Sequence, residues 1–188
     1  MAPLLSMDEL AKMLVPVGTI SEATKAEMYR LLERYYEGTS YEKFVADLSE
    51  KEHVFMFREG PRLVGFSTIV RQRIPELANA IFVFSGDTVI DEEYWGGRFL
   101  QIAFGYYMFG TKLFNPRVPV YWMLISKGVK TYLMMRRNFN LSHPNYTGET
   151  PDSVKHVMDG FSGSRFGAAY APETGLLRFE GGRDAARC

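Results

Sequence analysis

A strand-like run followed closely by a helix-like run limits most strongly what this chain can fold into. The run from Ala80 to Ile90 is apolar almost throughout, with four consecutive core-forming residues at 81–84. Such near-continuous apolarity is typical of a strand that is covered on both faces. From Gly97 to Met108, apolar residues repeat with the period of an α-helix and extend around most of its circumference. We therefore predict a central strand with a largely buried helix packed against it.

Two amphipathic helices are predicted ahead of this unit. Each follows a serine that can cap a helix N-terminus, Ser21 for the first and Ser40 for the second. The apolar positions after the caps have helical spacing: Met28, Leu31, Leu32 and Tyr35 in the first helix, and Tyr41, Phe44, Val45 and Leu48 in the second. The β-type runs Val54–Arg58 and Leu63–Val70 then flank a Glu-Gly-Pro turn, which predicts a β-hairpin.

The segments after Met108 continue this alternation. Val118–Ile125 predicts a strand, and Lys127–Arg137 predicts a helix. Pro151–Met158 is compatible with a short helix, and Tyr170 together with Leu176–Phe179 predicts a last hairpin. We expect one α+β domain over residues 21–180, an N-terminal segment over residues 1–20 and a loose tail over residues 181–188.

Composition excludes several classes of protein. Lys plus Arg and Asp plus Glu each number 22, so no overall field draws the chain to nucleic acid or to an anionic membrane. Cys188 is the only cysteine, which excludes an internal disulfide or a thiolate metal cluster and favours a reducing, cytoplasmic location. The three histidines lack the spacing of metal ligands, so no metal is expected. Charges within the apolar patches of residues 1–17 argue against a signal peptide or a membrane span.

Two stretches carry a resemblance to a known family. Asp91–Leu100 reads DEEYWGGRFL and joins the predicted central strand to the buried helix, and Trp122–Phe139 reads WMLISKGVKTYLMMRRNF and covers a strand and a helix. With the order of elements from Ser21 to Phe139, they make the chain similar to the GCN5-related N-acetyltransferase (GNAT) superfamily. The resemblance implies an α+β fold with a mixed central β-sheet flanked by helices.

The resemblance also implies a site for a pantetheine thioester. The residues implied to bind this co-substrate are Gly96, Gly97, Arg98, Ser126 and Lys127. A helix N-terminus has backbone donors and a partial positive charge that suit a phosphate, and a guanidinium can add charge-assisted hydrogen bonds. Arg98 and Leu100 occupy positions where the family has small residues, and the two glycines lie one turn early. Loop glycines and solvated cations remain the alternative interpretation.

Tyr132 and Asp87 are the candidate catalytic residues. In the family, a tyrosine on the helix after the fifth strand commonly protonates the departing thiolate, although Tyr132 lies two positions early against that pattern. Asp87 lies on the central strand or at its bend and is a candidate general base. The alternatives are a core aromatic for Tyr132 and turn chemistry for Gly86-Asp87. Glu92 and Glu93 are interpreted as first-turn acids of the following helix.

Together these features favour an acyltransferase. It would move an acyl group from acyl-CoA or from the phosphopantetheine of an acyl carrier protein to a small-molecule or peptide amine. The alternative is a non-catalytic module of the same fold that senses a ligand or binds a partner. The stripe of aromatic and methionine residues from Phe99 to Met135 is interpreted as core, with a groove for a long acyl chain as the other interpretation. A homodimer is left open.

Overall fold

The computed structural model of the chain describes residues 12–74, 76–77, 79–126, 132–133, 137, 139, 141–144 and 148–178. The helices and strands of these residues are, in chain order, β1 (Leu14–Pro16), α2 (Glu22–Glu33), α3 (Tyr41–Ser49), β2 (His53–Glu59), β3 (Arg62–Arg73), β4 (Ile81–Ile90), α4 (Phe99–Phe114), β5 (Val120–Leu124), α6 (Asp152–Phe166), β6 (Tyr170–Ala171) and β7 (Leu176–Leu177). Short 3-10 helices lie at η1 (Val17–Thr19), η2 (Glu92–Tyr94) and η3 (Gly167–Ala169).

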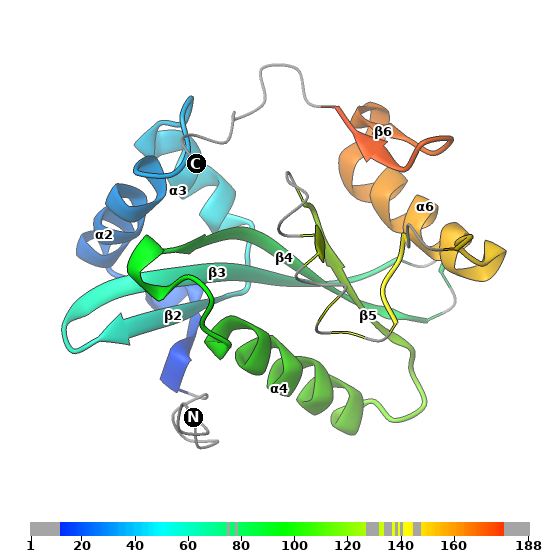
Figure 1. Ribbon diagram of the computed structural model, residues 1–188, viewed down its shortest axis with the longest axis horizontal. Coiled ribbons are helices and arrows are strands. Elements are labelled where there is room, and N and C mark those ends of the chain that lie inside the picture. Colours follow the sequence, from blue (N-terminus) through cyan, green and yellow to red (C-terminus); the bar gives the residue numbers. More distant parts are fainter. Residues whose placement is uncertain are drawn as a thin grey trace.

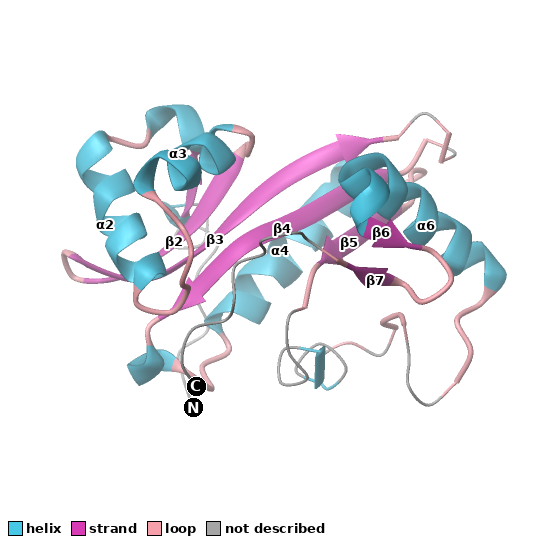
Figure 2. Ribbon diagram, turned by 90° about the horizontal axis from the view of Figure 1, so that it is seen from above, coloured by secondary structure: helices cyan, strands magenta, loops and turns pink. Residues whose placement is uncertain are grey.

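A mixed sheet with strand order β1-β2-β3-β4-β5 forms the centre of the molecule. The strands from β1 to β4 pair antiparallel, and β5 pairs parallel to β4. Helix α4 covers one face, whereas α2, α3 and α6 cover the other (Figures 1 and 2). The predicted central strand is confirmed, because β4 is paired on both sides.

Strand alternation divides the apolar residues between the two faces of the sheet. On β2, Val54 and Met56 pack with α2 and α3, whereas Phe55 and Phe57 pack with α4. A third cluster lies between α6 and β4. Each face of the sheet therefore has its own apolar clusters with the helices that cover it, because successive side chains of a strand point to opposite faces.

Trp122 connects three of these elements. Its ring on β5 stacks on Phe104 of α4, with centroids 4.6 Å apart and an interplanar angle of 10°. Its Nε1 donates a hydrogen bond to Ser85 Oγ on β4 at 3.0 Å. A tryptophan whose polar atom is satisfied in this way packs at little cost. This contact fixes α4 against the parallel strand pair.

The predicted helix caps are confirmed, and the sheet begins before the first of them. Thr24 N donates to Ser21 Oγ, and Lys43 N donates to Ser40 Oγ, each at 3.2 Å. Strand β1 pairs with β2 through Leu14–Pro16, so part of the segment that precedes Ser21 belongs to the sheet.

The predicted buried helix is present with different bounds. It begins at Phe99, because Gly96 at φ +86° keeps the preceding junction out of helical geometry. It continues past Met108 to Phe114, because no residue that breaks a helix occurs until Pro116. The extension adds three large apolar residues to the helix, Phe109, Leu113 and Phe114, and all three are exposed.

The C-terminal part follows the predictions with one extension. The short helix predicted over Pro151–Met158 is the start of α6, which runs to Phe166 because Phe161 packs on β4, 5.3 Å from the Phe82 ring. The predicted last hairpin is confirmed by the pairing of β6 with β7. Most of the helix predicted over Lys127–Arg137 lies outside the described residues, as does Phe179. Within the described part, no helix combines the length and the apolar character that crossing a membrane requires.

Phe161 provides a test of this packing. It is 1% exposed and contacts two rings of β4, so Phe161→Ala should lower the free energy of unfolding by about 3–5 kcal/mol. Chemical denaturation measures the change. Phe114→Ala is the matched control, because Phe114 is 85% exposed, and its effect should stay within about 0.5 kcal/mol. Equal effects of the two substitutions would contradict the placement of α6 on β4.

Candidate functional site

A bulge marks the point at which β4 and β5 part. Their last paired residues are Ser85 and Leu124. Immediately beyond, the register against β3 shifts, so that Gly86 and Asp87 together lie opposite Thr68. A bulge of this kind re-aims the strand and commonly lies beside a functional site. The second half of β4 therefore continues past the end of β5.

Close packing over the bulge requires glycine at position 86. A Cβ there would lie 2.5 Å from Thr68 Oγ1 and 3.2 Å from Lys51 Cε. Thr68 is 1% exposed, and its hydroxyl has no hydrogen-bond partner within the described part of the chain. The bulge therefore combines a bare backbone with a buried polar atom, and an unsatisfied atom of this kind in a native fold is uncommon.

Two cations lie near the bulge on the face that carries α3 and α6. Burial lowers the pKa of Lys51, the charge of Arg165 lowers it further, and the carboxylate of Asp87 opposes both effects. The Arg165 guanidinium lies 4.3 Å from the centre of the Phe84 ring, and burial lowers its pKa as well. Arg165 also lines a hollow of about 340 Å³ together with Glu50, Gln72, Ser164 and Phe166.

Sequence reasoning missed Lys51 and Arg165. Lys51 lies in a run of alternating charges that reads as a solvated helix end, and Arg165 lies on a helix that was predicted too short. No local pattern relates either residue to Asp87, since the three come together only through the sheet.

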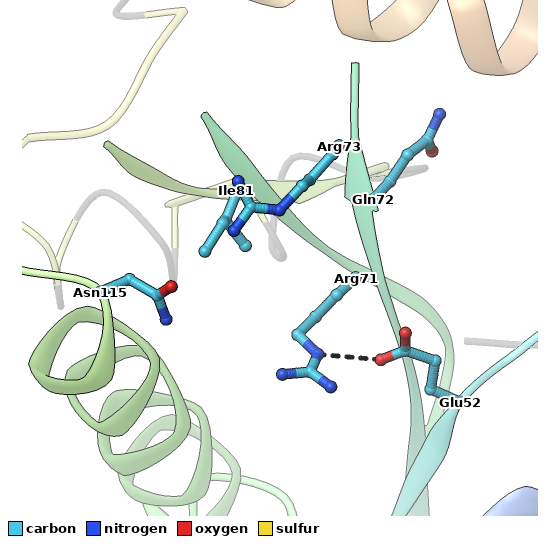
Figure 3. A pocket seen from close by; sticks show the side chains of 6 residues that line it. All are labelled: Glu52, Arg71, Gln72, Arg73, Ile81 and Asn115. Carbon is cyan, nitrogen blue, oxygen red and sulfur yellow. Dashed lines mark hydrogen bonds and ion pairs between the residues drawn. The ribbon is translucent and has the colours of Figure 1, made fainter. Parts of the chain in front are cut away.

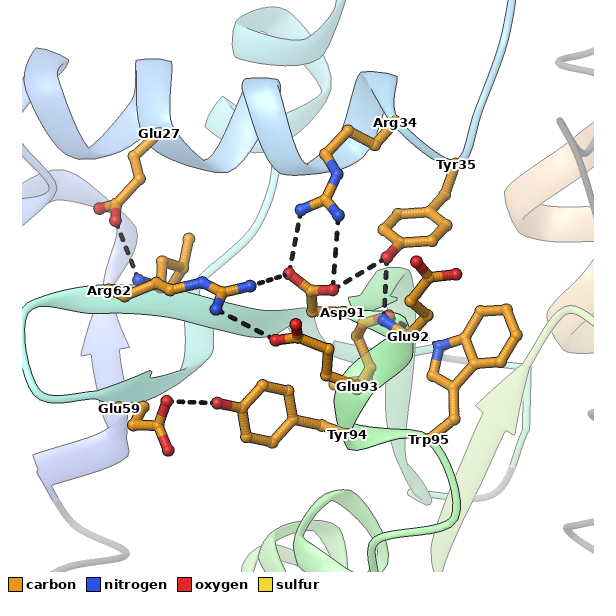
Figure 4. Close-up of polar contacts among 12 residues, drawn as sticks. Glu27, Arg34, Tyr35, Glu59, Arg62, Asp91, Glu92, Glu93, Tyr94 and Trp95 are labelled. Atoms are coloured by element: carbon orange, nitrogen blue, oxygen red, sulfur yellow. Dashed lines mark hydrogen bonds and ion pairs between the residues drawn. The ribbon is translucent and has the colours of Figure 1, made fainter.

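The junction from β4 to α4 is held by one buried carboxylate. Asp91 is 1% exposed and accepts hydrogen bonds from Arg34 Nη1 at 2.9 Å, from Arg62 Nη2 at 2.7 Å and from Tyr35 OH at 3.2 Å (Figure 4). Burial alone would raise the pKa of Asp91, but the hydrogen bonds from Arg34 and Arg62 outweigh it and hold the pKa below its usual value. The carboxylate thus joins α2, β3 and the end of β4.

Side chains also fix the backbone on either side of Asp91. Tyr35 OH accepts a hydrogen bond from Glu92 N at 2.9 Å, and Trp95 Nε1 donates to Ile90 O at 2.8 Å. Glu93 binds Arg62, with 3.1 Å between the charged atoms. The interpretation of Glu92 and Glu93 as first-turn acids of α4 is wrong, since both lie in η2 and the first turn of α4 contains no acidic residue.

The N-terminus of α4 is open. Its N-cap is Arg98, no side chain caps it, and residues 96–98 are exposed. Leu100, which departs from the family pattern by its size, is partly buried against the core cluster between α4 and the sheet. The uncapped amides and the helix dipole, with Arg98 beside them, suit an anion.

The predicted site residues lie on different parts of the fold. Gly96, Gly97 and Arg98 form the exposed entry to α4, and Asp87 lies at the bulge of the strand that leads to it. Ser126 follows the end of β5, whereas Lys127 lies outside the described residues. The Tyr132 hydroxyl donates to Pro144 O at 2.9 Å.

A second hollow, of about 280 Å³, lies at the other end of β4. Figure 3 shows its lining residues, Glu52, Arg71, Gln72, Arg73, Ile81 and Asn115. An ion pair between Arg71 Nε and Glu52, 3.0 Å apart, crosses it. Ile81 begins β4, so this hollow is separated from the bulge along the strand and contains none of the predicted site residues.

Comparisons with known proteins establish the fold. No family model and no curated protein sequence matches the chain. The aminoglycoside N-acetyltransferase AAC(6')-Iy in complex with CoA is 10% identical, with 73% of this chain and 93% of that chain covered and a TM-score of 0.51. AAC(6')-IG from Acinetobacter haemolyticus is 8% identical, with 73% of this chain and 97% of that chain covered and a TM-score of 0.52. A ribosomal-protein-alanine N-acetyltransferase from Brucella melitensis is 11% identical, with 73% of this chain and 96% of that chain covered and a TM-score of 0.51. The predicted GNAT-like fold is confirmed.

The Asp91 contacts predict a dependence of stability on pH. Because the folded-state pKa of Asp91 is depressed, its contribution is fully present above the pKa of the unfolded chain, about 3.9, and is lost as the pH falls through the lower folded value. Asp91→Asn should therefore lower the free energy of unfolding by about 2 kcal/mol at pH 6–7, and the difference from the wild type should shrink below about pH 4.

Urea denaturation at several pH values measures this difference. Glu93→Gln is the control, because Glu93 is 62% exposed and its removal should change the free energy of unfolding by less than about 0.5 kcal/mol at any pH. A difference between Asp91→Asn and the wild type that stays constant down to about pH 3 would contradict the depressed pKa.

Proposed function

We propose that this GNAT-like domain is an acyltransferase that moves an acyl group from a pantetheine thioester to an amine. The observation that carries the proposal is the uncapped N-terminus of α4, which follows β4 after residues 91–98, and β4 has by then parted from its parallel neighbour β5. Where β4 and β5 part, the edge of β4 has unpaired backbone groups that can bind a thioester. The N-terminus of α4 has backbone N–H groups that can bind the phosphate of the same molecule. Both lie on one continuous stretch of chain, residues 85–99.

The phosphate of the donor would bind at Gly96, Gly97 and Arg98. Gly96 has a positive φ, and an added Cβ there would meet no atom within 4 Å, so the backbone at Gly96 is open to a ligand. The Phe99 ring and the Tyr94 carbonyl fill the corresponding space at Gly97. Arg98 adds a cation, and Leu100, where the family has a small residue, packs partly buried against the core cluster between α4 and the sheet. Ser126, which follows β5, and Lys127, the next residue in the sequence, are proposed as further donors to the same molecule. The co-substrate is acyl-CoA or an acyl-phosphopantetheine.

The chemistry would be a direct attack of the amine on the thioester carbonyl. A bond forms between the amine nitrogen and the carbonyl carbon, the bond between that carbon and sulfur breaks, and the amine loses one proton while the thiolate gains one. Backbone N–H groups of β4 near the bulge, together with the Thr68 hydroxyl, are the groups that could polarise the carbonyl. No covalent intermediate with the protein is needed.

Asp87 is proposed to take the proton from the amine. It lies at the bulge, beside the point where the thioester carbonyl would be held. Lys51, whose pKa is lowered by burial, faces the same part of β4 and is a second group that can hold a proton there.

Tyr132 is proposed to protonate the departing sulfur. Its hydroxyl donates to Pro144 O in the structure, so this role requires the bond to be exchanged for one to the thiolate. The competing function is a non-catalytic module that binds a pantetheine ligand or a partner. Release of free thiol from a panel of acyl-CoA and acyl-carrier donors in the presence of amines separates the two functions.

Arg98→Glu tests the donor site. Reversal of the charge next to the bound phosphate should weaken donor binding at least tenfold, about 1.5 kcal/mol, through loss of a charge-assisted hydrogen bond. Calorimetric titration with acetyl-CoA measures the affinity. Arg30→Glu, an exposed change on α2, is the control and should leave the affinity unchanged. Equal affinities of the Arg98→Glu variant and the wild type would remove this site from the proposal.

Tyr132→Phe tests the general acid. Removal of the hydroxyl should lower turnover by about 10² or more while the melting temperature stays nearly unchanged, because the ring remains. Tyr106→Phe, on the exposed face of α4, is the control and should keep full turnover. Thiol release gives the rate, and thermal unfolding gives the stability. A Phe variant as fast as the wild type would eliminate Tyr132 as the acid.

A further inference from the structure

The zero net charge of the chain conceals a separation of charge along it. Between Tyr94 and Gly148 there are seven basic residues and no acidic residue: Arg98, Lys112, Arg117, Lys127, Lys130, Arg136 and Arg137. The rest of the chain contains the other 15 basic residues and all 22 acidic residues. The basic stretch includes the whole of α4 and β5. A surface built from this part of the chain is therefore positive, although the molecule as a whole is neutral.

Helix α4 is apolar on two opposite faces. Ala103, Phe104 and Tyr107 face the sheet, and the first two of them are buried. On the outer side, Tyr106, Phe109 and Leu113 repeat at intervals of three and four residues and are 39%, 68% and 63% exposed. Phe114 ends the helix and is 85% exposed. We call these four exposed residues the outer stripe.

Nothing in the described part of the chain covers the outer stripe. Figure 1 shows α4 by itself on one side of the sheet, while α2, α3 and α6 lie on the opposite side. A helix that is apolar all round is ordinarily buried, and large apolar side chains that gather on a surface mark an interaction site. The extra apolar residues of α4 are therefore neither core nor, on this outward face, a groove for an acyl chain.

The charges around the outer stripe indicate which kind of partner it can bind. Lys112 lies within α4, Arg98 at its start and Arg117 just after its end, and all three are exposed. A second copy of the chain bound through the same face would bring basic surface against basic surface, which is unfavourable. The partner must therefore offer apolar contact together with negative charge.

The shape of the outer stripe favours a lipid bilayer over a folded protein as its partner. The side chains of the outer stripe are exposed, and at Gly105 and Gly110 of the same helix an added Cβ would meet no atom within 4 Å. Phe and Leu on one face of a helix, with Lys and Arg beside them, are typical of helices that lie in the interface of an anionic bilayer. The apolar side chains enter the acyl boundary, and the cations remain among the headgroups.

We propose that α4 docks this protein on the surface of a membrane that contains anionic lipids, with the outer stripe inserted and Lys112 and Arg117 among the headgroups. The inner face of α4 stays packed on the sheet, so the helix lies along the surface of the bilayer. This proposal does not depend on the proposed function, because the outer stripe contains none of the residues assigned to the donor or to catalysis.

The test is co-sedimentation of the full chain with vesicles. Vesicles of phosphatidylcholine with about one third phosphatidylglycerol should bind the protein at least tenfold more tightly than vesicles of phosphatidylcholine alone. The binding should weaken as the ionic strength rises from about 0.05 M to about 0.5 M. Absence of binding to the anionic vesicles, or equal binding to both kinds, would overturn the proposal.

Two pairs of variants locate the binding surface. The double variant Phe109→Asn, Leu113→Asn should bind the anionic vesicles at least tenfold more weakly, whereas Leu176→Asn, at a leucine that is 55% exposed on β7, should bind as the wild type does. The double variant Lys112→Gln, Arg117→Gln should also lose affinity, with Arg30→Gln as its control. Unchanged thermal unfolding would show that the fold is intact. Binding that survives both double variants would overturn the assignment to α4.

Two further outcomes would assign the outer stripe to another partner. Analytical ultracentrifugation without lipid shows whether the chain self-associates, and a dimer that Phe109→Asn, Leu113→Asn dissociates would assign the stripe to a second copy. Binding to an acyl carrier protein that the same variant abolishes, with no binding to vesicles, would assign it to an acidic protein. Either result would replace the membrane proposal.

Discussion

Strand β4 is ten residues long and its parallel neighbour β5 is five residues long, so only the first half of β4 is paired on both sides. The difference in length between β4 and β5 divides β4 into two halves with different roles. The first half is apolar, carries α4 on one face and α6 on the other, and forms the core. The second half has β3 on one side, contains the bulge at Gly86 and Asp87, and leads into the turn before α4. Of the residues proposed for catalysis or donor binding, Asp87, Gly96, Gly97 and Arg98 lie on this half or at the turn after it, and Ser126 lies just after β5.

A turn that contains two adjacent glycines needs an anchor if it is to hold a ligand in one place. Asp91 supplies the anchor, because its buried carboxylate binds Arg34, Arg62 and Tyr35 from two other elements. The arginines are about half exposed, so each contact on its own would contribute little, but the carboxylate that they share is withdrawn from water. Gly96 leaves the backbone open to a ligand, and the carboxylate limits where that backbone can lie.

Local sequence patterns predicted the helices and strands. The candidate site depends on contacts between residues that are far apart in the sequence, and local patterns do not contain these. The caps at Ser21 and Ser40, the hairpin and the apolar run of β4 each lie within one element, so sequence reasoning located them. Lys51, Asp87 and Arg165 come from three elements, and no spacing in the sequence relates them. The outer stripe of α4 was merged with the core, because a helix that is apolar on two opposite faces reads from its sequence as a helix that is apolar throughout. Net charge gave no sign of the basic stretch between Tyr94 and Gly148, since a balance over the whole chain does not show where the charges are.

The two tryptophans of the chain occupy opposite surroundings, and this difference has an optical consequence. The Trp122 indole is stacked on Phe104 and hydrogen-bonded to Ser85, whereas Trp95 is 57% exposed and tied to the backbone at the entry to α4. Fluorescence from Trp122 should be shifted to the blue and respond mainly to unfolding, whereas fluorescence from Trp95 should be shifted to the red and accessible to aqueous quenchers. Events at the helix entry and in the core can thus be followed separately in the unlabelled protein.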